Sequence, residues 1–405
     1  MENAKKNIQM IDLLKFIAAI MVVCIHSEPI SGNEWFNFLV KNILCRIAVP
    51  LFFISSAYFI RKSTVNKEGN LKGKIVHLLK NYLFWSVVFL PIGLDWINQN
   101  LSISPSLYPA ALLFGLVYSG TYYHLWYIPA FILSVVIITK ARQYISYKLI
   151  FLIAAALYFV GSLETYYGLI TIDWVKEIFD GFIHLFFTTR NGLFYGMIFT
   201  AIGFFIYDYE QKLLTFKKYF KWALLFLGSL LFLEGVIVYN MLRLDCNFLI
   251  VLIPFSFVLF LWGITSEIKL PFNTVKLRAL SHYYYFIHPI CIVILFEIGN
   301  AFNLSFFNKG LTGFLLSYLF THLLSVFLIK LKEQQVGRGI WLSSFLSGAV
   351  FTTVIVGCIY IFETASVPIQ FELASCVLIS QIIILAALIS KLISLRRKRN
   401  IYSLG

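Results

Sequence analysis

Charged residues are scarce in this sequence, and their scarcity excludes most soluble folds. Asp, Glu, Lys and Arg make up 13% of the 405 residues, whereas 60% are hydrophobic. A soluble domain carries about 25% charged residues. The hydrophobic residues form long continuous runs, unlike the alternating segments of about ten residues in an outer-membrane β-barrel. The composition therefore predicts an all-α, polytopic helical membrane protein in a lipid bilayer.

Cysteine pairs with the spacing of metal or redox sites are also lacking. The six cysteines lie in or beside apolar runs, and no two of them form a C-x-x-C pair. We expect them to be small apolar packing residues, with neither a disulfide framework nor a zinc site. No HExxH, GxSxG or P-loop pattern occurs either. The sequence thus favours a protein without a bound metal.

Twelve apolar segments are long enough to cross a bilayer. A further apolar stretch, 105–119, is shorter and is expected to be re-entrant or interfacial. The first segment has no small-residue cleavage site, and we expect it to be a retained helix. The predicted spans are 11–29, 43–60, 75–97, 123–140, 148–164, 190–207, 220–240, 246–264, 283–301, 311–330, 340–362 and 370–394.

Lys and Arg are distributed unevenly over the loops between these spans. With a cytoplasmic N-terminus, 27 of the 33 lie on the cytoplasmic side and six lie outside. The positive-inside rule then predicts that both termini are cytoplasmic. The same bias accounts for the net charge of +14 without a nucleic-acid partner. The polar turn 332–339 is expected to separate a membrane domain, 1–335, from a two-helix segment with a basic tail, 336–405.

The first predicted span carries three ionisable residues, Asp12, Lys15 and His26. Such groups are costly inside a membrane and usually mark function. Lys15 and His26 are eleven positions apart, which places both on one helix face, about 16 Å apart along the axis. Asp12 lies one turn before Lys15 and is expected to pair with it. One face thus presents a cation towards the cytoplasm and a titratable base at the outer end.

Other polar residues lie at the predicted outer ends of later spans. We expect them to form an outer polar cluster with His26, whereas His288 is expected on the cytoplasmic side. Taken singly, a terminal Arg is more often an anchor at the membrane surface. A buried Glu is equally often a packing group. The candidate ligand-binding or catalytic residues are Arg46, Tyr123, His124, Trp126, Arg190, Asn191, Glu234, Glu297 and His288.

This arrangement suits the transfer of a group from a charged cytoplasmic carrier to an acceptor outside. Acyl-CoA is such a carrier, with phosphates at one end of a long arm and a thioester at the other. Lys15 is expected to hold a phosphate or to line the path of the arm, and His26 to take the proton of an acceptor hydroxyl. Arg46 or Arg190 is expected to stabilise the developing oxyanion or to bind an anionic acceptor.

Five blocks of the sequence resemble the acyltransferase-3 family of integral membrane proteins. Lys15, ten residues and then His26 is similar to the family's Arg/Lys-x10-His signature. The other four blocks keep the order of the family, and the resemblance covers about 1–330. HLWY and TRNG are most similar to the membrane half of vancomycin-resistance-type serine racemases. The blocks are VPLFFISSAYF (49–59), HLWYIPA (124–130), RNGLFYGMIFTAIGFFI (190–206) and YYYFIHP (283–289).

The resemblance implies O-acylation of a cell-surface glycan in the bacterial plasma membrane, with acetyl-CoA as the expected donor and His26 and Lys15 essential. The serine uptake linked to the racemase membrane half leaves a small-solute transporter as an alternative. A non-catalytic subunit that exports or assembles surface polymer is a third. Two positions depart from the family. Lys15 replaces the commoner Arg and loses its bidentate fork, and Ala57 replaces a Gly, where a looser helix contact is expected.

Overall fold

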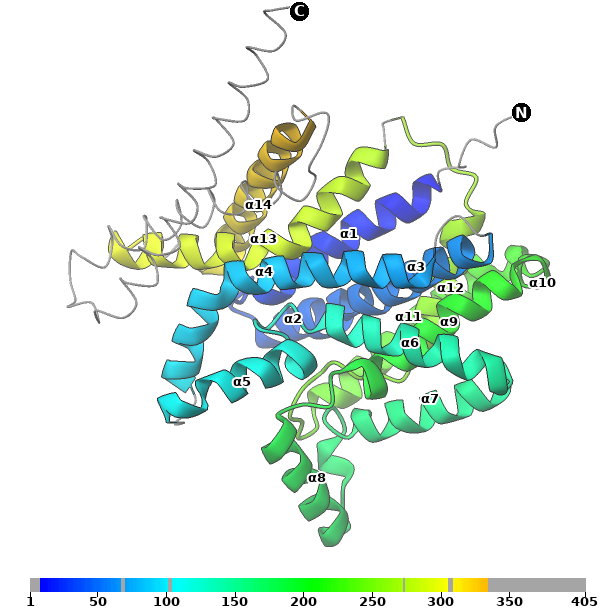
Figure 1. Ribbon diagram of the computed structural model, residues 1–405, viewed down its shortest axis with the longest axis horizontal. Helices are drawn as coiled ribbons and strands as arrows, with labels where there is room; N and C mark the ends of the chain where they lie inside the picture. The colour runs from blue at the N-terminus through cyan, green and yellow to red at the C-terminus, as the bar shows by residue number, and fades with distance from the viewer. Residues whose placement is uncertain (1–7, 67–69, 101–103, 272–273, 305–308, 334–405) are drawn as a thin grey trace, which may run out of the picture.

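The computed structural model describes residues 8–66, 70–100, 104–271, 274–304 and 309–333. Over these ranges the chain is helical and contains no strand (Figure 1). The predicted spans 340–362 and 370–394, and with them the predicted segment 336–405, lie outside the described residues.

Six helical segments in this part of the chain have the length and hydropathy to cross a membrane. Each overlaps a predicted span, because a long apolar run can satisfy its backbone hydrogen bonds within a helix. The number of crossings and the orientation of the termini stay predictions. The segments are α1 (Gln9–His26), Glu34–Val65, which includes α2 (Glu34–Phe38) and α3 (Ala48–Val65), α4 (Leu71–Asn100), α11 (Phe220–Tyr239), α13 (Thr274–Ala301) and α14 (Gly310–Glu333).

Shorter helices fill most of the remaining chain. The stretch predicted as re-entrant or interfacial is a short apolar helical segment, Tyr108–Ser119. The other helices are α5 (Tyr108–Phe114), α6 (Tyr127–Tyr144), α7 (Tyr147–Ser162), α8 (Asp173–Phe186), α9 (Met197–Asp208), α10 (Glu210–Leu214) and α12 (Leu252–Thr265). Single turns of π or 3-10 helix are η1 (Leu39–Leu44), η2 (Cys45–Ile47), η3 (Pro105–Leu107), η4 (Gly115–Ser119), η5 (Tyr167–Leu169), η6 (Gly192–Gly196) and η7 (Lys217–Tyr219).

The centre of the bundle is the contact between α3 and α9, against which α1 also packs (Figure 1). A Cβ atom added to Gly203 of α9 would lie 2.5 Å from the carbonyl oxygen of Ile54 and 2.7 Å from the Cβ of Ala57. Ala57 is fully buried. The expectation of a looser contact at Ala57 is therefore wrong, because the opposing helix supplies the glycine that lets the two backbones approach.

Ion pairs join helix ends on the side predicted to face the cytoplasm. Arg61 of α3 forms a bidentate pair with Asp208 of α9, at 2.8 and 2.9 Å. Asp12 of α1 is paired in the same way with Arg278 of α13, at 2.8 and 3.0 Å. The predicted pairing of Asp12 with Lys15 is therefore wrong. The Arg guanidinium of the neighbouring helix donates one hydrogen bond to each carboxylate oxygen. A lysine ammonium on the same helix cannot form this bidentate pair.

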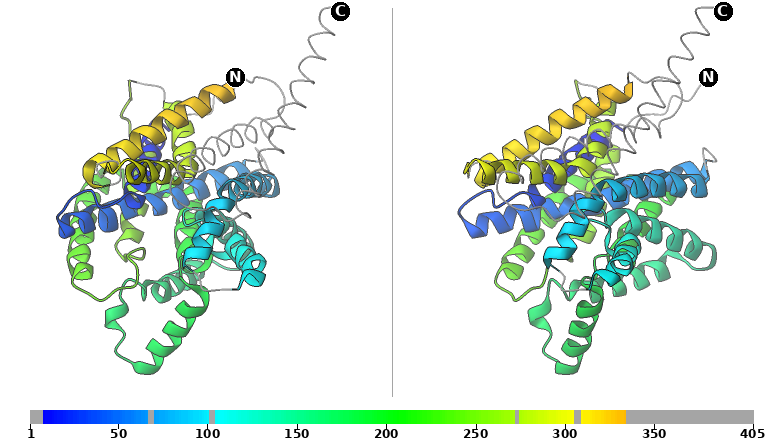
Figure 2. Two further views of the ribbon diagram at one scale, coloured as in Figure 1. Left: turned by 90° about the vertical axis from the view of Figure 1, so that its left-hand side faces the viewer. Right: turned by 60° about the vertical axis from the view of Figure 1, so that its left-hand side comes forward.

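Two further helices matter for the site. α14 packs along α13 and closes one side of the bundle (Figure 2). α8 projects away from the bundle (Figure 1) and was not expected from the sequence. Its fourteen residues include four charged ones, so it lacks the continuous apolar run by which a membrane span is found.

Candidate active site

Three histidines from separate elements meet at the end of α1. The ring of His26, the last residue of α1, stacks on the ring of His288 from α13 with their centroids 5.4 Å apart. The ring of His124, in the loop before α6, meets His288 edge-on, also at 5.4 Å. The ring of Tyr123 lies 4.5 Å from that of His26. The histidine predicted on the cytoplasmic side therefore lies beside His26.

The start of α13 explains that error. The predicted span began at residue 283, whereas α13 begins at Thr274. The first turns of the helix are polar and carry Lys276 and Arg278, so they are missing from the hydropathy signal. His288 consequently lies about four turns inside the helix rather than near its start. By contrast, α1 is one unbroken helix, so Lys15 and His26 share a face as predicted.

The protonation pattern of the His288 ring follows from its contacts. Its Nδ1 atom lies 2.8 Å from the carbonyl oxygen of Tyr284. A carbonyl oxygen only accepts, so Nδ1 carries the proton and Nε2 presents a lone pair. The side chain is fully buried, and Nε2 has no hydrogen-bond partner among the described residues. The site thus holds a proton acceptor that is sheltered from water and left open.

The His124 ring is enclosed by aromatic side chains. It lies edge-on to Phe89 at 4.6 Å and tilted against Tyr285 at 5.5 Å. The Tyr285 hydroxyl donates to the backbone oxygen of His124 at 2.9 Å and fixes this loop. Both ring nitrogens of His124 are buried and lack a hydrogen-bond partner within the described ranges. His124 can therefore offer a donor and an acceptor to a bound molecule.

Arg46 and Arg190 share a single carboxylate, that of Asp245. Arg46 Nη2 lies 3.8 Å from Asp245 Oδ1, and Arg190 Nη1 lies 3.9 Å from Asp245 Oδ2. Arg46 is held further by Asn42, to which it donates at 3.0 Å, and by Asn247. Two guanidiniums with one carboxylate leave a net charge of +1. The structure thus brings the two predicted arginines together, around an aspartate that sequence reasoning missed.

Asp245 gave no signal in the sequence. It lies in the loop between α11 and α12, one residue before a predicted span that the structure begins only at Leu252. The intervening segment is an irregular loop. An acidic residue in such a loop is usually solvated, and only the tertiary contacts with Arg46 and Arg190 single it out.

Trp126 and Asn191 place the Arg190 side chain. The guanidinium carbon of Arg190 lies 5.2 Å from the centroid of the Trp126 ring, a cation–π contact. Asn191 accepts hydrogen bonds from the backbone N–H groups of Leu193 and Phe194 at 2.8 and 3.1 Å and so caps η6. Its amide nitrogen donates to the Tyr118 hydroxyl at 2.9 Å. Asn191 therefore fixes the chain beside Arg190. Both polar atoms of its side-chain amide are hydrogen-bonded within the protein.

The two predicted glutamates lie away from the histidines. Glu234 of α11 accepts hydrogen bonds from the backbone N–H groups of Ile250 and Val251, at 2.6 and 3.1 Å, and from the Tyr166 hydroxyl. It thereby satisfies the free N–H groups at the start of α12. Glu234 thus has a packing role, the alternative to ligand binding. Glu297 is an exposed residue of α13, nine positions beyond His288 and about two and a half turns further along the helix.

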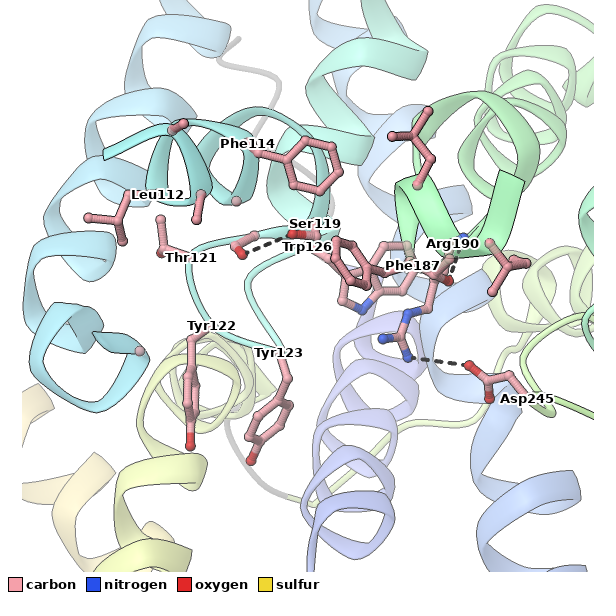
Figure 3. Close-up of a pocket in the computed structure, with 18 of the residues that line it drawn as sticks. Leu112, Phe114, Ser119, Thr121, Tyr122, Tyr123, Trp126, Phe187, Arg190 and Asp245 are labelled. Atoms are coloured by element: carbon pink, nitrogen blue, oxygen red, sulfur yellow. Dashed lines mark hydrogen bonds and ion pairs between the residues drawn. The ribbon is translucent and has the colours of Figure 1, made fainter. Parts of the chain in front are cut away.

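A cavity of about 820 Å³ adjoins the histidine cluster. Tyr123, Trp126, Arg190 and Asp245 all contribute to its wall (Figure 3). α5 and the chain from α8 to Arg190 form its other sides. Tyr123 lines the cavity and also contacts the His26 ring, so it connects the cavity with the three histidines.

Glu164 is a second cavity residue that the sequence did not single out. It lies in the turn after α7 and is 2% exposed. Burial raises the pKa of its carboxyl to about 7, and the negative charge of Asp245 acts in the same direction. The backbone N–H of Thr189 donates to Glu164 and opposes this rise. The charge of this wall therefore changes near neutral pH.

Comparisons with known proteins place the chain among relatives and in a family. An amino-acid racemase of Enterococcus faecalis is 28% identical over 334 residues, which are 80% of this chain and 46% of the relative. A serine/alanine racemase of Enterococcus gallinarum is 31% identical over 229 residues, 55% of this chain and 32% of the relative. The chain spans less than half the length of these relatives, and no solved structure matches it. The family model for an acyltransferase domain matches residues 8–331, and the chain therefore belongs to the acyltransferase-3 family of multi-pass membrane proteins.

Proposed function

We propose that the protein transfers an acyl group, with acetyl the expected one, from cytoplasmic acyl-CoA to a hydroxyl of a cell-surface glycan outside a bacterial plasma membrane. The observation that carries the proposal is the stack of His26 on His288 beside a cavity lined by Arg190 and Asp245, two members of a paired but net cationic arginine cluster. The family match supports the class of reaction.

His26 is the base in this reaction. It takes the proton from the acceptor hydroxyl while the hydroxyl oxygen attacks the thioester carbonyl carbon. The carbon–sulfur bond then breaks, and the CoA sulfur leaves with the proton that His26 returns. General base catalysis of this kind contributes about 10²–10⁴-fold to the rate. His288 supports it by stacking on the His26 ring and fixing its orientation, while its Nε2 accepts a hydrogen bond from a second hydroxyl of the acceptor.

The arginine cluster stabilises negative charge. Asp245 neutralises one guanidinium, and the remaining positive charge of the cluster favours the oxyanion formed when the hydroxyl attacks. Arg46 is fixed by two asparagines and Arg190 by the Trp126 ring, so little reorganisation is needed during the reaction. An anionic group on the acceptor would bind at the same place.

Lys15 lies three turns towards the predicted cytoplasmic side from His26, on the same face of α1. We assign it to the path of the carrier, where it contacts a phosphate or the pantetheine arm of acyl-CoA. Its half-buried position inside a helix bundle fits a cation that meets an anionic ligand. The proposed co-substrate is acyl-CoA, and no metal takes part in the proposed steps.

Mass spectrometry of surface glycans from cells with and without the protein tests this proposal. Cells that make the protein should show an added acyl mass, expected to be acetyl, on a glycan. His26→Ala should remove that mass while the amount of protein in the membrane stays the same. An unchanged glycan in the His26→Ala strain would contradict the assignment of the base.

Transport of a small solute such as serine is the second candidate function. The observation in its favour is that the relatives with curated names are amino-acid or serine/alanine racemases. Membrane vesicles that contain the protein should then take up labelled serine, and should transfer no label from acetyl-CoA to any acceptor. The two assays on one vesicle preparation distinguish the two functions.

A further inference from the structure

The two ends of the cavity differ in polarity. One end is formed by apolar side chains of α5, among them Leu112 and Phe114 (Figure 3), and Leu185 at the end of α8 also lines the cavity. The other end presents Trp126, Arg190 and Asp245 (Figure 3). A ligand that matches both ends has a polar head and an apolar chain.

Several apolar residues that line the cavity are also exposed at the surface. Leu107, Leu185 and Phe187 line the cavity, yet 53%, 64% and 58% of their respective surfaces are exposed. Contiguous exposed apolar side chains on a protein mark a contact with lipid or with a partner. In a multi-pass membrane protein the bilayer is the apolar phase at hand, so the mouth of the cavity faces lipid.

α8 has the pattern of a helix that lies in the plane of a membrane surface. Trp174, Ile178 and Leu185 fall within about 40° of one another around the helix and are all more than 60% exposed. Phe179, on another face, is buried against the protein. An amphipathic helix that is not part of the bundle and carries large exposed apolar side chains on one face is typical of interfacial helices. This helix forms one side of the cavity mouth.

We infer that the acceptor is an amphiphile of the membrane leaflet, a hydroxylated head group on a hydrocarbon chain, rather than a free water-soluble sugar. This inference rests on the proposed function, because it names the class of acceptor for the same site. The head group enters towards Trp126 and Arg190, and the chain leaves between α5 and α8. Drug-sized ligands occupy pockets of about 300–1,000 Å³. A cavity of about 820 Å³ therefore holds a disaccharide and the first part of a chain, while the rest lies against Leu107, Leu185 and Phe187.

Photo-cross-linking of the full-length protein in lipid nanodiscs tests the inference. The probe is a dodecyl glycoside of an N-acetylglucosamine disaccharide with a diazirine near the head of the chain. Mass spectrometry should map its cross-links to α5 and to residues 183–188. Excess unlabelled dodecyl glycoside should reduce the labelling at least tenfold more effectively than the methyl glycoside of the same disaccharide. Equal competition by the two glycosides, or an absence of cross-links at the cavity, would overturn the inference.

Two matched variants separate the cavity from general contact with lipid. Leu185 lines the cavity and Ile178 does not, although both lie on α8 and are 64% and 66% exposed. Leu185→Gln should lower labelling by the dodecyl probe at least fivefold, and Ile178→Gln should leave it unchanged. Equal effects of the two substitutions would show that α8 merely touches lipid, against the inference. The labelling is then compared in nanodiscs with and without phosphatidylglycerol. If the site takes a glycerol head group, phosphatidylglycerol should compete with the probe and lower the labelling. If the site takes a saccharide head group, the labelling should stay the same.

Acetyl transfer to the same two glycosides distinguishes failure of the inference from failure of the proposed function. Transfer to the dodecyl glycoside alone supports both. Equal transfer to both glycosides refutes the amphiphile while the acyltransferase proposal stands. Chain-dependent labelling with no transfer to either glycoside supports the amphiphile site and counts against acyl transfer.

Discussion

Replacing His288 with leucine should inactivate the protein without destabilising it. The ring of His288 is fully buried, and its Nε2 atom has no partner in the described chain. Such an atom is expected at a functional site, where a polar group is held ready for a substrate. Leucine has a similar volume and no polar atom, so it keeps the packing while it removes the lone pair.

The expected change in the free energy of unfolding follows from two hydrogen-bonding groups. A buried acceptor without a partner costs about 1–3 kcal/mol, and leucine removes that cost. The substitution also removes the bond from Nδ1 to the carbonyl of Tyr284, which is worth about 0.5–1.5 kcal/mol. That carbonyl keeps its helical bond to the backbone N–H of residue 288. The variant should thus lie between about 0.5 kcal/mol less stable and about 2.5 kcal/mol more stable than the parent.

The activity should fall by about 10²-fold, the effect expected when the acceptor is no longer held in place beside the catalytic base. Thermal unfolding in detergent and transfer of labelled acetyl groups by the same preparation measure the two effects. His322 of α14 provides the control, because its Nδ1 is already bonded to the Tyr284 hydroxyl at 2.9 Å. His322→Leu should lose about 1 kcal/mol of stability and keep its activity.

The reasoning fails if stability and activity change in the opposite way. A His288→Leu protein that unfolds at a clearly lower temperature while retaining transfer activity would show that His288 is a structural residue and that the reasoning from its open Nε2 is wrong. If both histidine variants lost activity in proportion to stability, neither would have a chemical role.

Three other substitutions test the arginine cluster, the carboxyl in the cavity wall and the packing of α3 on α9. Asp245→Asn should raise the affinity of the cavity for an anionic glycoside by about tenfold, because two partly buried guanidiniums lose their shared counter-charge; an unchanged dissociation constant in low salt would argue against a functional cluster. The raised pKa of Glu164, about 7, means that its folded form binds a proton more tightly than the unfolded chain, so the melting temperature should fall as the pH rises from 5 to 8. Glu164→Gln should flatten this slope, and a slope of equal size in that variant would assign it to other groups. Gly203→Leu should prevent close packing of α3 on α9 and cost at least about 3 kcal/mol, seen as loss of folded protein in detergent; Gly181→Leu, in open space, should not.

The helices were largely predictable, since a continuous apolar run fixes both the helix and its approximate length. Lys15 and His26 could be placed on one face because the geometry of a single helix is regular. Contacts between helices were predictable only in part. The outer cluster of Arg46 and Arg190 was expected from the ends of their spans, whereas their carboxylate partner, Asp245, comes from an irregular loop.

The misplaced residues share a physical cause. Helices continue past the apolar core of the membrane, and their polar turns escape a hydropathy signal. The polar start of α13 moved His288 to the wrong side, and the charges of α8 concealed a helix that forms a wall of the cavity. Asp12 was paired within its own helix, whereas the better partner, Arg278, lies on α13 and is 266 positions away. Sequence spacing describes neighbours within one helix and says nothing of the next one.

In the proposed reaction an acyl group passes from a carrier on one side of the membrane to a hydroxyl on the other, with His26 as the base. The most direct test uses sealed proteoliposomes with labelled acetyl-CoA on the side where Lys15 lies and the dodecyl disaccharide glycoside on the side where His26 lies. The parent protein should produce labelled glycoside, and His26→Ala should lower the labelling at least 100-fold. Equal labelling by the two proteins, or labelling only when both substrates are on one side, would contradict the proposed reaction.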